Sequence, residues 1–213
     1  MKRLFRKIDT AIINDMSVVE FTGQVVIVDT TRAAEMAVDS LFQEPIVGID
    51  TETRPAFRKG IIHEVALLQV STHDVCYLFR LNKIGLTPAI VQLLSSDSPA
   101  MVGLSLSDDL LRLRQRCDFT PGNFIDLQDE VARFGIQDRG LRKLYANFFQ
   151  QKISKRQQLS NWEAPVLSDR QVVYAATDAW ACLMLYEEFQ RLLDSGDYYV
   201  EPDEEPMLTD ERT

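Results

Sequence analysis

The stretch Ile46-Val47-Gly48-Ile49-Asp50-Thr51-Glu52 decides how this chain is interpreted. An apolar run that ends in two acids is typical of a buried β-strand that opens into a cleft. Residues two apart in an extended strand face the same side, so we expect the carboxylates of Asp50 and Glu52 to lie together. Like charges so close repel each other, and a hard divalent cation such as Mg²⁺ or Mn²⁺ removes that repulsion. The alternative is a pair of solvated acids at the end of a strand.

Strands and helices alternate on both sides of this stretch. We expect strands over residues 24–29, 65–70, 75–79, 101–106 and 123–127, and helices over 32–43, 87–94, 108–116, up to 149, and from 169 to about 193. The turn-like residues 71–74 favour a hairpin between two of these strands. Ser168 and Gln171 form a capping box ahead of the last helix. The pattern predicts an α/β fold in which helices cover both faces of a mixed sheet.

The length of 213 residues suits a single folded domain with its own core. We expect an N-terminal extension over residues 1–22, the domain over 23–194, and an acidic, flexible tail over 195–213. No apolar run approaches the roughly 20 residues that a membrane helix needs. The basic N-terminus is not followed by the apolar segment of a signal peptide. These features predict a cytoplasmic protein without a membrane partner.

The charge is unevenly distributed along the chain. The net charge of −9 argues against broad binding to nucleic acid. However, residues 139–156 carry six Lys or Arg and no acid, so they can form a local basic surface or, alternatively, a solvated helix face. The three cysteines, Cys76, Cys117 and Cys182, form no C-x-x-C pair and are expected to be small core residues.

Two further acidic motifs lie downstream. Tyr174 and Asp178 are four residues apart and share one face of a helix that is otherwise apolar. An Asp in such a helix is unfavourable unless it is paired or binds a metal, although it could also lie at a polar edge. Asp108 and Asp109 follow a predicted strand, where they could simply favour the N-terminus of the next helix.

Together these segments resemble the DEDD 3′–5′ exonucleases, specifically the tyrosine-containing branch that includes ribonuclease D and the Werner-syndrome exonuclease domain. The resemblance rests on three blocks and spans roughly residues 25–193. The blocks are residues 47–52 continued by 65–70, residues 102–110, and residues 159–179. It implies an RNase H-like fold, two divalent metal ions (Mg²⁺ or Mn²⁺), and release of nucleoside 5′-monophosphates from the 3′ end of DNA or RNA.

The resemblance also implies a role for each acidic position. The metal-binding acids would be Asp50, Glu52, Asp109 and Asp178, and Tyr174 would orient the attacking water. Asp50, Glu52 and Asp178 would hold one metal, and Asp50 and Asp109 the other.

Two nearby acids need a separate interpretation. Asp109 fits the family pattern better than Asp108, because of its spacing from Gly103 and the Leu110 that follows it. Asp126 is interpreted as a structural or supporting acid.

The loop after Glu52 supplies the candidates for substrate binding. Phe57, Arg58 and Lys59 could contact the 3′-terminal nucleotide by stacking and charge, and His63 could assist them. The alternative for each is an ordinary exposed loop residue. Trp162 is expected to pack in the core rather than to stack on a base.

The sequence therefore predicts a metal-dependent 3′–5′ exonuclease that acts on nucleic acid with a free 3′ end. A rival hypothesis is a non-catalytic nucleic-acid-binding module that retains the fold. The complete set of acids argues against it, because a degenerate member should have lost at least one. A third hypothesis is an interaction protein that uses its acidic tail.

Overall fold

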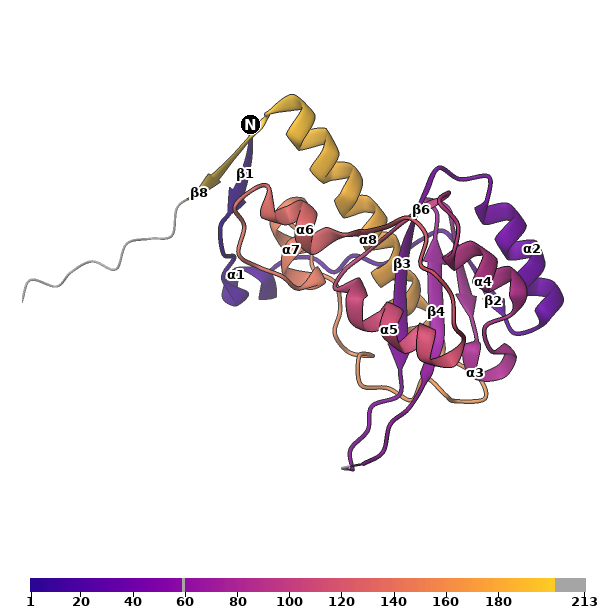
Figure 1. Ribbon diagram of the computed structural model, residues 1–213. Helices are drawn as coiled ribbons and strands as arrows, with labels where there is room; N and C mark the ends of the chain where they lie inside the picture. Colours follow the sequence, from indigo (N-terminus) through magenta and orange to yellow (C-terminus); the bar gives the residue numbers. More distant parts are fainter. Residues whose placement is uncertain (59, 202–213) are drawn as a thin grey trace, which may run out of the picture.

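The strand that carries Asp50 lies inside a six-stranded mixed sheet in the computed structural model, which describes residues 1–58 and 60–201 (Figure 1). The strand order is β2 (Gln24–Val28), β5 (Val75–Phe79), β4 (Val65–Ser71), β3 (Ile46–Thr53), β6 (Ala100–Gly103) and β7 (Phe124–Asp126). The pairs β3–β4 and β4–β5 are antiparallel, and the other three pairs are parallel. The predicted mixed sheet and hairpin are therefore confirmed.

Helices cover both faces of this sheet, as predicted. The helix α8 (Asp169–Ser195) crosses one face against β3, β4 and β5. On the other face lie α2 (Thr31–Leu41), α3 (Leu81–Ile84), α4 (Pro88–Leu94) and α5 (Leu106–Arg116). The C-terminal half of α8 packs on α6 (Leu127–Ala132) and α7 (Leu141–Phe149), and the short α1 (Thr10–Asn14) lies against α7.

Small residues let α8 approach the sheet closely. Ala175, Ala176 and Ala179 are fully buried on the sheet-facing side of α8. A Cβ atom on Gly48 of β3 would lie 2.0 Å from the carbonyl oxygen of Ala179, so only glycine fits there. This close contact brings Asp178, the neighbour of Ala179, next to β3.

The two ends of the described chain meet in a separate two-stranded parallel sheet. It is formed by β1 (Lys2–Phe5) and β8 (Tyr198–Glu201). The Tyr198 ring packs on Phe134 with ring centroids 4.9 Å apart, and Leu4 is fully buried in the same cluster. Within the tail predicted to begin at residue 195, the structure places the end of α8 and strand β8, whose apolar side chains pack on the core, and the division into domain and tail stays a prediction. Residues 202–213 lie outside the described residues.

The chain turns earlier after β6 than the sequence predicted. The expected strand over 101–106 ends at Gly103, and α5 begins at Leu106. The Asp126 carboxylate accepts hydrogen bonds from the backbone N–H groups of Ser105 and Leu106, which hold this turn. Ser105 adopts the left-handed region with φ of 59°.

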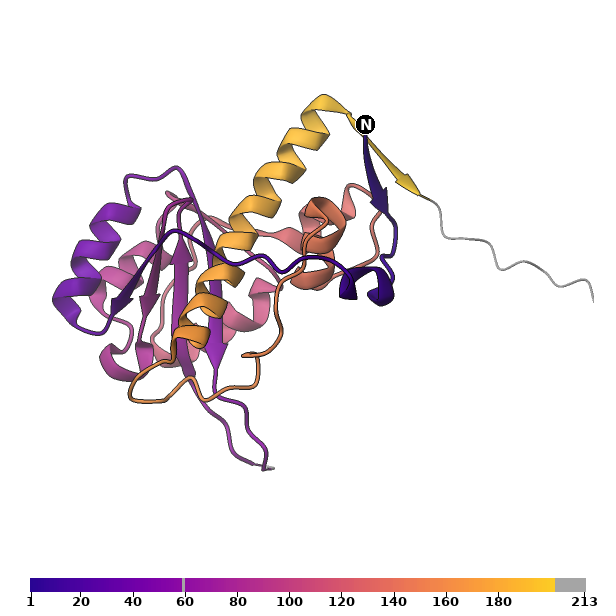
Figure 2. The same ribbon diagram turned by 180° about the vertical axis from the view of Figure 1, so that it is seen from behind.

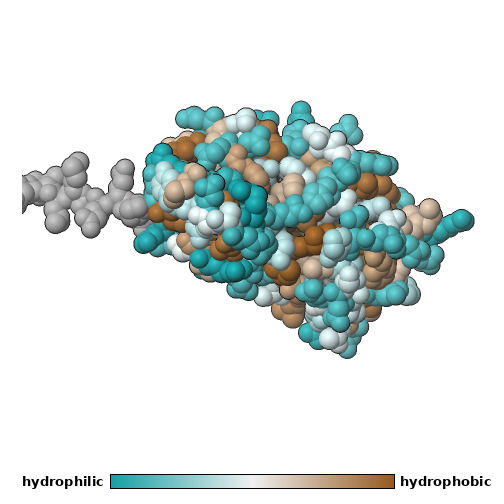
Figure 3. Space-filling model, turned by 90° about the horizontal axis from the view of Figure 1, so that it is seen from above, coloured by the Kyte–Doolittle hydropathy of each residue, from teal (hydrophilic) through white to brown (hydrophobic). Residues whose placement is uncertain are grey.

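Apolar residues fill the interior, and polar residues predominate on the face of the molecule in Figure 3. Trp162, Cys76 and Cys182 are buried in the core, as predicted, and Cys117 is half-buried. The face shown in Figure 3 is mostly hydrophilic, with hydrophobic residues in small patches. Over residues 1–58 and 60–201, no helix combines the length and apolar character needed to cross a membrane.

Candidate active site

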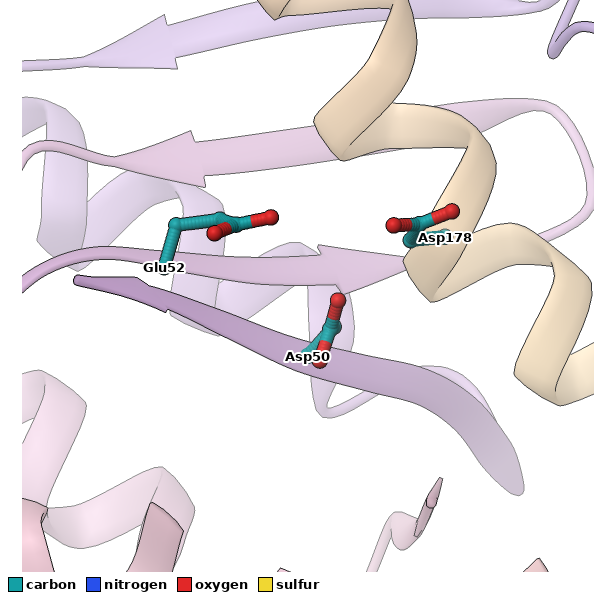
Figure 4. A group of neighbouring side chains, drawn as sticks. All are labelled: Asp50, Glu52 and Asp178. Atoms are coloured by element: carbon teal, nitrogen blue, oxygen red, sulfur yellow. The ribbon is translucent and has the colours of Figure 1, made fainter. Parts of the chain in front are cut away.

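Three carboxylates converge from two elements. Asp50 and Glu52 extend from β3, and Asp178 extends from α8 toward them (Figure 4). Each offers an oxygen that lies within 4.8 Å of an oxygen of the other two. The i, i+2 spacing on β3 and the close packing of α8 produce this arrangement. The structure thus brings together three of the four acids singled out in the sequence.

Burial strongly perturbs the ionisation of this cluster. Burial raises the pKa of Asp50 well above its usual range, and the charges of Asp178 and Asp109 add to that increase. Burial, together with the charge of Asp50, raises the pKa of Glu52 to about 10. Burial also raises the pKa of Asp178 to about 7, against the opposing effect of a hydrogen bond with Tyr174. The cluster therefore requires either protons or a cation.

The donor set fits a hard divalent metal ion. Within the described part of the chain, no Lys or Arg forms an ion pair with any of the three acids. The Oδ1 atom of Asp178 is buried and has no hydrogen-bond partner among those residues. Oxygen ligands from several carboxylates are what Mg²⁺ and Mn²⁺ prefer.

Tyr174 lies one helical turn before Asp178, and its hydroxyl is close enough to lower the pKa of that carboxyl. Burial and the charges of Asp178 and Glu52 raise the pKa of the Tyr174 phenol far above neutrality. The hydroxyl therefore keeps its proton and can act as a donor at the edge of the cluster. The ring packs near Trp162, with centroids 6.0 Å apart, which helps to fix its orientation.

Asp109 lies beside the cluster but outside the group of three. Its Oδ1 accepts a hydrogen bond of 2.6 Å from the Thr51 hydroxyl, between Asp50 and Glu52 on β3. Its charge contributes to the raised pKa of Asp50. Asp108 is exposed on α5. The geometry favours Asp109 over Asp108 as the acid that belongs to this site. The role of Asp109 as a metal ligand stays a prediction.

Asp126 has a structural role that agrees with its interpretation from the sequence. Its carboxylate accepts hydrogen bonds from the backbone N–H groups of Ser105 at 3.0 Å, Leu106 at 2.9 Å and Gln128 at 2.9 Å. It therefore caps α6 and fixes the start of α5, the helix that carries Asp109.

Replacing Asp126 by Ala should lower the free energy of unfolding by roughly 3 kcal/mol, because three backbone donors lose a charged acceptor. For a chain of this size that corresponds to a fall in Tm of about 6–12 °C, measurable by thermal denaturation. Asp129→Ala is the matched control, since Asp129 is exposed in the first turn of α6. Equal losses in the two variants would contradict this role.

The loop residues predicted to bind substrate lie in a different hollow. Phe57, Arg58 and His63 line a cavity of about 400 Å³ that shares no lining residue with the carboxylate cleft. The Phe57 side chain is 82% exposed. His63 Nδ1 lies 2.9 Å from Glu163 Oε1, which ties the loop to the 160s segment. Lys59 lies outside the described residues, so the structure does not place this set at the carboxylates.

The basic segment does reach the carboxylate cleft. This cleft, of about 450 Å³, is lined by the three acids together with Arg142, Lys143 and Lys155. From the sequence, this segment could form either a basic surface or a solvated helix face. The available signal was the run of six Lys or Arg without an acid over residues 139–156.

Residues 25–194 match a family model described as 3′-5′ exonuclease. The chain belongs to this 3′–5′ exonuclease family. The match contains all the acids of the site, and it confirms the family predicted from the three sequence blocks. Exonuclease 3′-5′ domain-containing protein 2 of Drosophila melanogaster is 32% identical over 144 residues, which cover 66% of this chain and 25% of the relative.

Two further relatives correspond to the predicted branch. The bifunctional 3′-5′ exonuclease/ATP-dependent helicase WRN of Mus musculus is 28% identical over 162 residues, covering 73% of this chain and 12% of that protein. The crystal structure of Escherichia coli RNase D superposes with a TM-score of 0.71 at 20% identity, covering 81% of this chain and 46% of that one. This likeness shows the RNase H-like exonuclease fold. The chain spans a quarter or less of the two aligned relatives' lengths.

Proposed function

We propose that this protein is a metal-dependent exonuclease that hydrolyses the terminal phosphodiester bond at a free 3′ end of DNA or RNA and releases nucleoside 5′-monophosphates. The observation that carries the proposal is the convergence of Asp50, Glu52 and Asp178 within 4.8 Å, in a buried cleft. Four carboxylates around the inner strand β3, counting Asp109, are a donor set for divalent metals in phosphoryl transfer.

The acids divide into two overlapping sets of ligands. Asp50, Glu52 and Asp178 would hold one Mg²⁺ or Mn²⁺ ion, and Asp50 and Asp109 would hold a second. Such ions would lower the pKa of a water molecule and offset the charge on the phosphate and the leaving 3′ oxygen. The hydrogen bond from Thr51 fixes the Asp109 carboxylate beside β3, and α8 fixes Asp178.

Tyr174 contributes a protonated hydroxyl at the edge of the cluster. Because burial and neighbouring acids raise the pKa of this phenol, it stays a hydrogen-bond donor throughout the neutral pH range. It would orient the attacking water toward the phosphorus atom. The burial of the neighbouring Trp162 restrains the Tyr174 ring, so the hydroxyl is held in place before substrate binds.

Nucleic acid as the substrate is supported by the relatives. One structural neighbour, RNase D of Trypanosoma brucei, was solved in complex with the RNA U12. In this chain, Arg142 and Lys155 line the carboxylate cleft and can contact phosphate groups, whereas Lys143 in the same lining is paired with the buried Asp138.

The test is digestion of 5′-labelled single-stranded DNA and RNA with Mg²⁺, Mn²⁺ or EDTA, beside a circular single strand of each polymer. We expect products that shorten stepwise from the 3′ end, lost with EDTA and absent for the circles. Cleavage of circular substrate would refute the requirement for a free 3′ end. Binding without any cleavage, by a folded protein with either metal, would favour the non-catalytic binding module.

A further inference from the structure

A second hollow, of about 780 Å³, adjoins the carboxylate cleft. Residues 18–20, residues 152–157, Arg142 and the first turns of α8 line it, and we call it the basic groove. Arg142, Lys155 and Tyr174 line both the basic groove and the carboxylate cleft. The groove is therefore continuous with the site and begins at the tyrosine.

Unpaired positive charge gathers in the basic groove. The cations that line it are Arg142, Lys152, Lys155, Arg156 and Arg170. In the part of the chain that the structure describes, none of these five lies within 4.0 Å of a carboxylate oxygen. The lining acids are Glu20 and Asp169. A net positive surface in a chain of net charge −9 fits an anionic ligand that follows the groove.

Apolar side chains lie among these charges. Val19, Ile153 and Val173 line the basic groove beside the Tyr174 ring. Phosphates can contact the cations while exposed base faces contact the apolar groups, which is how sequence-tolerant single-strand sites are built. In a duplex the faces of the bases are covered by stacking on the neighbouring base pairs, so only the groove edges are left for such contacts. The combination favours an unpaired strand.

The N-terminal segment forms one wall of the basic groove. It runs across α8 before entering β2 (Figure 2). Lys152 N donates to Ser17 O at 2.9 Å, and Val19 N donates to Lys152 O at 3.0 Å. Phe21 N donates to the Thr177 hydroxyl on α8 at 3.0 Å. These bonds hold the wall in place.

Asn14 strengthens the same wall. Its side-chain oxygen accepts a hydrogen bond from Arg142 at 3.1 Å, and its backbone oxygen accepts one from Lys152. The family match begins only at residue 25. The wall formed by residues 18–20 therefore lies outside the region that the family model matches.

We propose that the basic groove binds the phosphate backbone of a single-stranded polynucleotide on the 5′ side of the nucleotide being removed. The inference rests on the proposed function, because the carboxylate cleft sets where the 3′ end lies. The basic groove then supplies the affinity of the enzyme for long single strands. Residues 14–20, which form and support its wall, contribute to that affinity.

Arg156→Ala/Arg170→Ala is the decisive variant. Both side chains are exposed and line the basic groove but not the carboxylate cleft. Binding of a labelled single-stranded 12-mer is measured in EDTA from 50 to 200 mM salt. Losing two phosphate contacts, at a slope of about −0.7 each, should shrink the affinity ratio of parent to variant by about sevenfold over that range. Arg6→Ala/Arg32→Ala, two exposed arginines that line neither hollow, is the control.

Glu20→Lys should change the affinity for the 12-mer in the opposite direction. It replaces a groove acid by a cation, so the 12-mer should bind several-fold more tightly, with a steeper salt dependence. Misfolding cannot produce tighter binding. Unchanged affinity in this variant, together with parent-like salt dependence in the double arginine variant, would overturn the proposal. So would a parent protein that does not bind the 12-mer in EDTA.

A one-nucleotide substrate separates failure of the groove from failure of the function. The p-nitrophenyl ester of thymidine 5′-monophosphate needs only the carboxylate cleft. With metal, the double arginine variant should lose at least tenfold more kcat/KM on the 12-mer than on this ester. Equal losses on both would refute the groove. A parent that hydrolyses neither substrate would refute the proposed exonuclease, while the binding measurements in EDTA still decide the groove.

Discussion

Replacing Asp50 by Asn should lower the rate of 3′-end hydrolysis by about a thousandfold or more, and Asp178→Asn should cause a loss of similar size. Asparagine keeps the shape of the side chain but removes the charge that a metal ligand supplies. Both acids belong to the group whose oxygens lie within 4.8 Å of one another, so losing either one disrupts the whole donor set. The measurement is kcat/KM on a labelled 12-mer at saturating Mg²⁺ or Mn²⁺.

The combined variant tests whether these acids act as one unit. Asp50→Asn/Asp178→Asn should be little worse than either single variant, because groups that act together give strongly non-additive losses. Asp108→Asn is the matched control, since this exposed neighbour of Asp109 lies outside the cluster, and it should keep the parent rate. A single Asp50→Asn variant with more than a tenth of the parent rate would contradict the assignment.

The sheet and the acid pair could be predicted because their signals are local. The apolar run before Asp50 and its spacing from Glu52 already specify a buried strand with both carboxylates on one face. The small residues around Asp178 on α8 likewise predict a close approach to the sheet, and the contact of Ala179 with Gly48 shows it. Local periodicity and residue size were therefore enough to predict how the three acids are arranged.

Features that depend on distant contacts were not predictable in the same way. Strand β8 forms because Tyr198 and Leu4 share a core cluster, although 194 positions separate them in the sequence. The acidic residues around β8 in the sequence had instead predicted a flexible tail. The turn after β6 is fixed by Asp126, which is 20 residues from Leu106. A pattern read along one segment carries no signal for such partners.

The substrate-binding residues show the same limit. The loop carrying Phe57 and His63 follows Glu52 directly in sequence, which suggested contact with the 3′-terminal nucleotide. In the fold, the Glu163 carboxylate holds His63 in a separate hollow. The cleft is instead lined by Arg142 and Lys155, which come from a segment far along the chain. Sequence proximity alone therefore does not say which residues line the carboxylate cleft, and substrate binding by the loop stays a prediction.

Metal-free protein should become less stable as pH rises from about 4 to about 7. In the unfolded chain Asp178 ionises near its ordinary pKa of 3.8, whereas burial raises the pKa in the folded protein to about 7. Below about pH 4 the group is protonated in both states and has no effect. Between pH 4 and 7 the unfolded state loses its proton and the folded state keeps it, so stability falls, by roughly 2–4 kcal/mol in all. Asp50 and Glu52 shift in the same direction.

Divalent metal should reverse that loss, and one variant isolates the cluster from every other titrating group. At pH 8 in EDTA, Asp178→Asn should raise Tm by several degrees, because it removes a buried charge that has no partner cation. Adding Mg²⁺ or Mn²⁺ at about 100 times its Kd should stabilise the parent by about 3 kcal/mol, and the variant much less. Thermal denaturation of both proteins from pH 5 to pH 8, with and without metal, makes the comparison. A parent whose Tm in EDTA rises with pH relative to the variant, or equal metal-induced shifts in the two proteins, would show that Asp178 is neither strained nor a ligand. The expected result is that the variant is more stable than the parent without metal and loses the metal-induced rise in Tm. The Asp178 carboxylate then both destabilises the metal-free protein and binds the ion, as a metal ligand must.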